Sequence, residues 1–250
     1  MIKYLTLAIG IASASAYATS TVGNMSEIPD TGTDAKKGFH GQVGVGVASL
    51  PEYVGGDETE GVGLPLINVS YNDRFYFKFN KLGAWVFKSD GGFRVGGVVT
   101  THAGFDDDDL PDKFQGYGDR ENSMMAGVNM EFKQGRFSTE VGYLTDVSDE
   151  SEGSKMYAQV GYTFLANRTY TLTAIGKIES LDEDMVGYYY GNNESTTNAT
   201  LGLVGTYKFS NQWAMIGAVT ATSLGDEIGD SAIVEEDSYN MALVGVTYSF

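Results

Sequence analysis

The last strand-like segment of the chain alternates strictly between apolar and polar positions. Counted back in steps of two from the C-terminus, the apolar side carries Phe250, Tyr248, Val246, Val244 and Ala242. The intervening positions 245, 247 and 249 are small or polar. A period of two is that of a β-strand, and an apolar outer face with aromatic residues is typical of outer-membrane barrels. We therefore interpret this segment as the closing strand of a barrel. The final strand of a soluble β-sandwich is the alternative.

The same alternation recurs upstream and predicts an all-β fold. Phe75, Phe77 and Phe79 share one face of a strand, for example, with Tyr76 and Lys78 on the other. The twelve predicted strands cover residues 39–48, 61–71, 74–80, 83–88, 92–100, 122–133, 135–144, 155–165, 169–178, 199–209, 212–223 and 239–250. An even number is expected for a single-chain bacterial barrel. The prediction is an antiparallel transmembrane β-barrel.

The connections between these segments alternate between short and long. The short ones are rich in Asn, Asp and Gly, which suit tight hairpin turns, and lie at 72–73, 89–91, 134, 166–168 and 210–211. The long ones cover 49–60, 101–121, 145–154, 179–198 and 224–238, and only Lys81-Leu82 is a short connection on that side. This rhythm predicts short periplasmic turns and long extracellular loops.

Charge follows the same division. Most of the 33 acidic residues fall in the predicted long loops, whereas basic residues lie near the short turns, and the net charge is −17. Such a balance argues against a nucleic-acid partner, which requires clustered Lys and Arg. An acidic rim would repel anionic lipopolysaccharide unless divalent cations bridge the two. The densest run, Asp106, Asp107, Asp108 and Asp109, does not match an EF-hand loop, so a solvated charge run is the favoured interpretation.

The N-terminus predicts export. Lys3 precedes an apolar run too short to span a bilayer, and Ala16-Tyr17-Ala18 forms an A-x-A site, so we expect a signal peptide over 1–18 that is cleaved near Ala18. Residues 19–38 lack periodicity and are predicted to form a flexible periplasmic leader before a barrel over 39–250. With no cysteines, disulfides cannot contribute to stability. The predicted location is the outer membrane of a Gram-negative bacterium, reached through the barrel assembly machinery.

The sequence contains few candidate residues for catalysis or for lining a pore. The two histidines, His40 and His102, fall at opposite ends of the predicted barrel, about a membrane thickness apart, and cannot share a site. His102 could form an acid–base pair with Asp106 or Asp119, but one histidine near many aspartates is common, and we predict no enzyme and no cofactor. Charged residues on the inner face would line a pore or pair and plug it; they are Lys78, Arg94, Glu131, Lys133, Glu140 and Lys208.

Four stretches carry a resemblance to a known family. Residues 63–75 read GLPLINVSYNDRF and resemble the L-P-x-I-x-V-x-Y-x-D-R-F stretch of the MipA/OmpV family of outer-membrane proteins. Similar likenesses occur at 116–119, 187–191 and 224–234, although Ala232 stands where proline is usual. The matching residues are Pro65, Asn68, Tyr71, Asp73, Arg74, Phe75, Gly118, Asp119, Tyr189, Gly191, Gly225 and Asp226.

The resemblance implies a function that the spacing alone does not. It implies a barrel and, for the namesake of the family, a non-enzymatic scaffold that tethers a murein lytic transglycosylase and a murein synthase at the outer membrane. The alternatives are a small solute channel and an acidic-looped surface receptor or adhesin. The expected partners are therefore these two periplasmic enzymes, together with membrane lipid and lipopolysaccharide.

Overall fold

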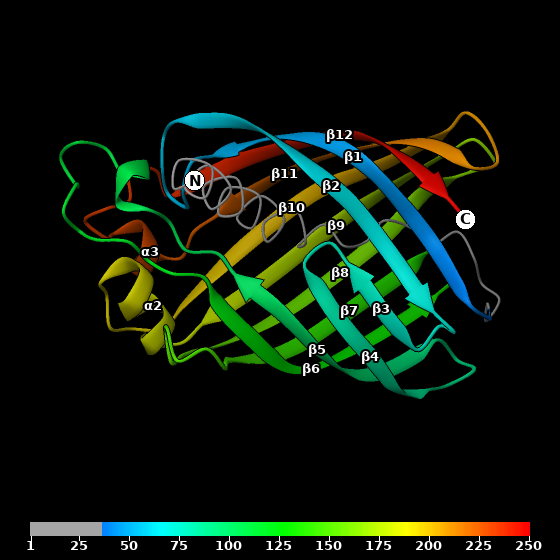
Figure 1. Cartoon of the computed structure of the whole chain (residues 1–250), viewed down its shortest axis with the longest axis horizontal. Coiled ribbons are helices and arrows are strands. Elements are labelled where there is room, and N and C mark those ends of the chain that lie inside the picture. Colours follow the sequence, from blue (N-terminus) through cyan, green and yellow to red (C-terminus); the bar gives the residue numbers. More distant parts are fainter. Residues whose placement is uncertain (1–36) are drawn as a thin grey trace, which may run out of the picture.

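The computed structural model describes residues 37–250, which form a closed antiparallel β-barrel (Figure 1). Its strands are β1 (Phe39–Pro51), β2 (Thr59–Tyr71), β3 (Phe75–Lys78), β4 (Lys81–Lys88), β5 (Phe93–His102), β6 (Ser123–Gln134), β7 (Phe137–Asp146), β8 (Ser154–Ala166), β9 (Tyr170–Leu181), β10 (Thr196–Lys208), β11 (Trp213–Ser223) and β12 (Ser238–Ser249). The predicted twelve-stranded barrel is confirmed. The predicted signal peptide, and the predicted leader apart from its last two residues, lie outside the described residues.

The wall is closed by pairing of the first strand with the last. Val45 lies opposite Val246 and Val47 opposite Val244 in the ladder between β1 and β12. The apolar face predicted for the last strand points outward: Val244 is 54% exposed, whereas Leu243 beside it is buried. This outward face is suited to lipid, because the closed ladder leaves no polar edge along the seam.

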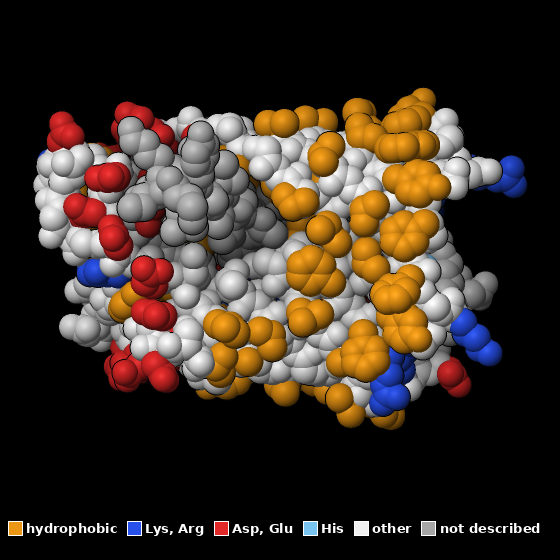
Figure 2. All heavy atoms as spheres, viewed as in Figure 1, with side chains coloured by type: hydrophobic (Ala, Val, Ile, Leu, Met, Phe, Trp, Pro, Cys, Tyr) orange, Lys and Arg blue, Asp and Glu red, His pale blue; other side chains and the backbone are white. Residues whose placement is uncertain are grey.

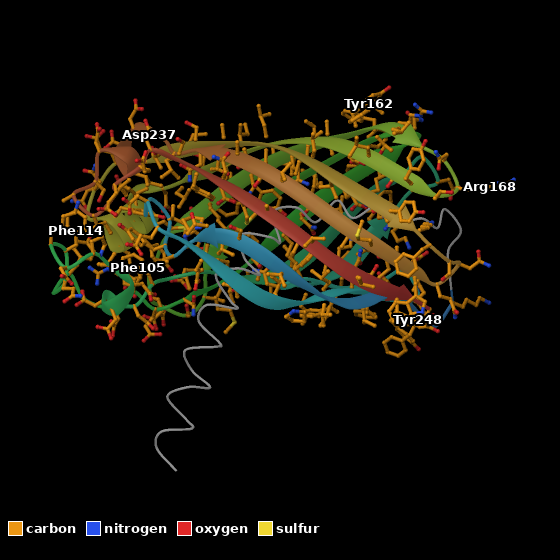
Figure 3. All side chains as sticks on the ribbon, turned by 90° about the horizontal axis from the view of Figure 1, so that it is seen from above. Phe105, Phe114, Tyr162, Arg168, Asp237 and Tyr248 are labelled. Carbon is orange, nitrogen blue, oxygen red and sulfur yellow. The ribbon has the colours of Figure 1, made fainter. Side chains whose placement is uncertain are left out.

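The two ends of the barrel differ in side-chain chemistry. Exposed aromatic residues gather towards the end that carries the short turns; they include Phe39, Phe75, Phe87, Phe93, Phe137, Tyr162, Tyr170, Tyr207, Phe209, Trp213 and Phe250. Figure 2 shows apolar side chains over the half of the barrel near the turns and acidic side chains at the opposite end. Figure 3 places Arg168 and Tyr248 at this turn end, and Phe105, Phe114 and Asp237 at the loop end.

The β3–β4 hairpin departs from the prediction. Lys81 and Leu82, predicted to form a connection, belong to β4, and the turn is formed by Phe79 and Asn80, since Lys78 pairs with Lys81. Phe79 was expected on the outer face with Phe75 and Phe77, yet it is 3% exposed. Its positive φ of 53° turns the chain and directs the ring inward, which interrupts the alternation.

Three short helices lie in the long loops: η1 (Asp107–Asp109), α2 (Glu183–Tyr190) and α3 (Asp226–Gly229). α2 begins where the Asp182 side chain accepts a hydrogen bond from the Met185 amide at 3.1 Å, and it ends at Gly191, which has a φ of 76°. No helix in the described part of the chain has the length and apolar character needed to cross a membrane.

Candidate functional site

The turn between β2 and β3 is tied to the point where the chain enters the barrel. The Asn72 side chain accepts a hydrogen bond from the Gly38 amide at 2.8 Å, and the Asn72 amide donates to the Gly38 carbonyl at 3.0 Å. His40 Nε2 lies 2.8 Å from Asp73 Oδ1, and Lys88 Nζ donates to the Asp73 carbonyl at 2.6 Å. The β2–β3 hairpin, which carries part of the family motif, therefore holds Gly38 and His40, at the start of β1, in place at this end of the barrel.

We expect Asn72→Ala to destabilise the barrel by ~1–2 kcal/mol, because alanine adopts the left-handed region less readily and the bond to Gly38 is lost. Asn72 has a φ of 52°. Asn72→Gly is the matched variant, since it removes the same bond and leaves the backbone unstrained. The measurement is the urea midpoint of the refolded barrel in lipid vesicles at constant m-value. Equal losses for Ala and Gly would show that the backbone conformation contributes nothing.

One half of the lumen wall carries a network of charged side chains. The Glu131 carboxylate, with its side chain 2% exposed, lies 3.1 Å from Lys133 Nζ and 3.7 Å from both Lys78 Nζ and Arg94 Nη1. These are the predicted interior charges, whereas Lys208 lies apart at the turn end of β10. The buried Glu131 carboxylate thus partly neutralises the positive charge of three basic side chains on the inner face of the barrel.

A second part of this network crosses the lumen. Glu140 Oε1 on β7 lies 3.5 Å from Lys81 Nζ on β4 and accepts hydrogen bonds from Tyr157 at 2.5 Å and from Asn129 at 3.4 Å. β4 and β7 are not neighbours in the wall. The pair between Lys81 and Glu140 therefore bridges the interior and narrows it.

Three further charged residues of the interior were not among the predicted interior charges. Glu179 was assigned to a long loop, but it lies within β9 and forms an ion pair with Lys177. Lys155 Nζ contacts His102 Nδ1 at 3.2 Å. Lys155 and Lys177 occupy inward positions of strands β8 and β9. The alternation of inward and outward positions along a strand is therefore the sequence signal that could have identified them.

Neither histidine is placed as the sequence suggested for catalysis. His102 packs its ring 4.8 Å from that of Tyr189 and contacts Lys155, instead of pairing with Asp106 or Asp119. Both ring nitrogens of His40 are engaged, one by Asp73 and the other by the Gly38 carbonyl at 3.3 Å. Because a general base needs a free ring nitrogen, the His40 ring is not available for that role, and His102 does not form the predicted pair with Asp106 or Asp119.

The other half of the lumen wall is apolar. Its side chains come from β1, β2 and β9–β12 and from the β3–β4 turn; they are Ala48, Leu50, Leu64, Leu66, Phe79, Ile175, Val204, Ile216, Ala218, Met241 and Leu243. The lumen therefore has one charged and one apolar wall, and the hairpin tip at Phe79 belongs to the apolar one.

The loops join into a packed cap at the loop end. Met185, Val186, Tyr189 and Tyr190 of α2 are buried against loop residues and against the ends of the inner wall. The Tyr189 hydroxyl donates to the Glu121 carbonyl at 3.1 Å and accepts from the Ser123 amide at 3.1 Å. Because these bonds join segments from different loops, the cap is a structured element and not a set of independent loops.

The motif residues from distant loops meet within this cap. A Cβ on Gly191 would lie 2.6 Å from the Tyr117 hydroxyl, and one on Gly225 would lie 2.2 Å from Thr196 Oγ1. The loops approach one another too closely there for any side chain. Asp226 opens α3 beside the second of these contacts. These motif positions consequently serve the packing of the cap.

The aspartate run is used within its own loop. Asp107 accepts hydrogen bonds from the amides of Gly116 and Gly118, both at 2.8 Å, and its own amide donates to Asp119 Oδ1 at 2.9 Å. Asp109 Oδ2 accepts from the Asp106 amide at 3.2 Å. Within residues 37–250, no group of three or more His, Cys, Asp or Glu side chains is arranged to hold a metal ion. Cation binding by Asp106 to Asp109 stays a prediction.

The cap contains two kinds of perturbed carboxyl group. Burial, and then the neighbouring Glu58, raises the pKa of Glu52, and burial raises the pKa of Asp109. Conversely, amide donors from the glycines at 116 and 118 lower the pKa of Asp107. The Lys113 ammonium, 2.7 Å away, lowers the pKa of Glu235. Relative to an ordinary carboxyl group, the environment of Glu52 and Asp109 therefore favours the protonated form, and that of Asp107 and Glu235 favours the ionised form.

We expect the cap to be most resistant to protease under mildly acidic conditions. As the pH falls from neutral, Glu52 and Asp109 take up protons above their ordinary pKa values of 4.5 and 3.8, which removes repulsion and stabilises the cap. At lower pH, protonation of Asp107 and Glu235 through their lowered pKa values removes stabilising bonds. Limited proteolysis at each pH, normalised to an unfolded substrate, checks this. Glu52→Gln should weaken the rise in resistance; an unchanged rise would contradict the assignment.

Comparisons with known proteins agree with this geometry. A family model described as "MltA-interacting protein MipA" matches residues 43–250. The "MltA-interacting protein" of Escherichia coli (strain K12) is 27% identical over 151 residues, which cover 53% of this chain and 58% of that protein, and the protein of the same name from Shigella flexneri matches equally. The chain thus spans little more than half the length of these curated relatives.

Two solved barrels are also similar in shape. The KdgM porin aligns with a TM-score of 0.48 at 13% identity, over 84% of this chain and 99% of its own. The COG4313 outer membrane channel from Pseudomonas putida F1 aligns with a TM-score of 0.49 at 9% identity, over 89% of this chain and 99% of its own. The family model, by contrast, covers nearly all of the barrel described above. This outer-membrane-type barrel belongs to the MipA family.

Proposed function

We propose that the chain is a non-enzymatic outer-membrane scaffold that holds a murein lytic transglycosylase and a murein synthase beside the murein layer. The observation that carries this proposal is the match of residues 43–250, nearly all of the barrel, to a family whose description names an interaction with MltA. The curated relatives bear the same name. Because this chain spans 58% of their length at 27% identity, its partners remain part of the proposal.

The turn end offers the surface for such partners. In an outer-membrane barrel the short turns face the periplasm, where murein enzymes work. Arg74, Arg136 and Arg168 lie at this end and are exposed to solvent, whereas most acidic side chains lie at the loop end (Figure 2). The hydrogen bonds between Asn72 and Gly38 also hold the first described residues of the chain at this end. The contact surface therefore combines the basic turns with residues 19–37.

Co-purification from the native outer membrane tests the proposal. The intact chain is compared with a variant lacking residues 19–37 and with one in which a Gly/Ser segment of the same length replaces them, both with the signal peptide and its cleavage site retained. We expect a murein hydrolase or synthase with the intact chain and less with either variant. Recovery of no murein enzyme, under conditions that capture other outer-membrane complexes, would rule out the scaffold role.

The lumen gives the channel alternative no support. The bridge between Lys81 and Glu140 crosses the interior, and the Glu131 cluster engages three basic side chains. Conduction would require these buried pairs to separate, which is costly when charges leave their partners. For the alternative of a surface receptor or adhesin, the negative charge of the cap is the one feature that speaks in favour.

A further inference from the structure

One strand of the wall extends beyond its neighbour. β3 pairs with β2 only from Asn68 to Tyr71, and the last bond on this side runs from the Phe79 amide to the Ile67 carbonyl at 2.8 Å. Figure 1 shows the β3–β4 hairpin ending partway along the wall between β2 and β5. Over residues 59–66, β2 pairs with β1 alone among the residues that the structure describes. Within residues 37–250, this part of β2 is therefore a free edge.

The free edge presents unpaired backbone groups. In an antiparallel ladder every second residue points its N–H and C=O to the same side, so positions 61, 63 and 65 face the gap as Ile67 does. Pro65 has no N–H to leave unpaired, and this position suits an edge strand. Gly61 and Gly63 each present one donor and one acceptor. The Asn80 side chain, at the tip of the hairpin, donates to the Thr101 carbonyl on β5 at 3.3 Å and not to β2.

This edge lies at the level of the lipid-facing band. Val45 lies opposite Pro65 and Val47 opposite Gly63, and their side chains are 72% and 57% exposed on the outer wall. Val45 lies midway along β1, and Val47 lies two residues nearer its loop end, which corresponds to the outer leaflet. Unpaired backbone groups are unfavourable in hydrocarbon, so the edge suits an occupant that supplies both a donor and an acceptor.

An apolar groove adjoins the edge on the outer wall. It has a volume of about 570 Å³ and runs across β9–β12 and β1 to Gly61. Gly205, Gly217, Leu203 and Val219 are among the residues that line it. A Cβ on Gly61 or Gly63 would meet no atom within 4 Å, so the outer face of β2 is bare between the edge and the groove.

We propose that this edge and groove bind an amide-linked acyl chain of an outer-leaflet amphiphile. The amide N–H and C=O pair with the carbonyl and amide groups of Gly61 and Gly63, as a neighbouring strand would. The acyl chain crosses the bare face of β2 and lies in the groove, where burial of its methylene groups is favourable. An added strand from a second copy satisfies the edge but leaves the groove unfilled. This lipid site goes beyond the scaffold role and is independent of it.

Photocrosslinking in bilayer nanodiscs tests the site with the mature barrel. The probe is a palmitoyl amide with a diazirine in its chain, and its comparison is the ester with the same chain, which lacks the N–H. We expect the amide to label β2 and the groove strands β10–β12, with about tenfold less labelling by the ester, the change expected for ~1.4 kcal/mol. Equal labelling by amide and ester, or labelling spread evenly around the barrel, would overturn the proposal.

The double variant Gly61→Ile with Gly63→Ile fills the bare face with side chains that favour strands, so folding should be retained. It should reduce amide labelling about tenfold. Gly97→Ile on β5 is the matched control, because this outward position lies in a fully paired part of the wall and its Cβ would meet only the Gly127 carbonyl oxygen, at 3.8 Å. Undiminished labelling of the double variant would contradict the site. So would a disulfide between two copies carrying Gly63→Cys, since it would place a second copy on the edge.

Discussion

Glu140→Leu is expected to lower the free energy of unfolding by ~3 kcal/mol, because it leaves the buried Lys81 ammonium without its partner. The same substitution removes the acceptor for the Tyr157 hydroxyl and for the Asn129 amide. Glu140 and Lys81 are 8% and 11% exposed at their side chains, so lumen water screens the pair only slightly. The effect should be seen as a lower urea midpoint in lipid vesicles.

The double variant Glu140→Leu with Lys81→Met distinguishes the effect of an unpaired lysine charge from the effect of replacing a polar side chain by an apolar one. Removing both charges should restore most of the stability, because no uncompensated charge remains. The exposed loop residue Glu58 provides the control, and Glu58→Leu should change the midpoint little. A loss no larger for Glu140→Leu than for Glu58→Leu would show that the lumen solvates Lys81 by itself.

Phe79→Ala is expected to cost ~3 kcal/mol, since it removes a buried aromatic ring from the apolar wall of the lumen. Phe79 is 3% exposed and packs in one cluster with Leu64 and Leu66. Its φ of 53° makes a second comparison informative. Phe79→Gly removes the same ring but relieves the left-handed backbone, so it should cost ~1 kcal/mol less than Phe79→Ala.

The same urea titration measures both Phe79 variants. Phe77→Ala is the control, because Phe77 belongs to the same short strand and is 38% exposed on the outer wall. In lipid vesicles its loss should be smaller than that of Phe79→Ala. Equal losses at positions 77 and 79 would contradict an inward role for Phe79.

The pattern of apolar and polar residues predicted the barrel because outward and inward positions alternate along each strand. The closing strand is an example, as its outward Val244 and Val246 follow from counting in twos. The β3–β4 turn followed no such rule. Alternation continues through Lys78, Phe79 and Asn80, and the turn lacks a glycine, so the pattern predicted the reversal two residues too late, at Lys81 and Leu82. The free edge of β2 arises because β3 ends early at this turn, so it could not be predicted from the sequence either.

In the loop cap, too, some features have a local sequence signal and others do not. Asp182 and Gly191 bound α2 as an N-cap and a left-handed C-cap, and both signals are present in the sequence. By contrast, contacts of Tyr189 with Glu121 and of Gly225 with Thr196 join residues from separate loops. Contacts between separate loops follow from how the barrel gathers the strand ends, and no local pattern encodes them.

Site-specific photocrosslinking in living cells tests the scaffold role most directly. A photoreactive amino acid is placed at a turn tip, Arg168, and in a second protein at Asp237 in the cap; Figure 3 shows these residues at opposite ends of the barrel. We expect a lytic transglycosylase to be captured from Arg168 or from the other turn tips at Asp90, Gly135 and Ser210, and none from Asp237. Capture from Asp237 alone, or from none of the turn tips, would contradict the account.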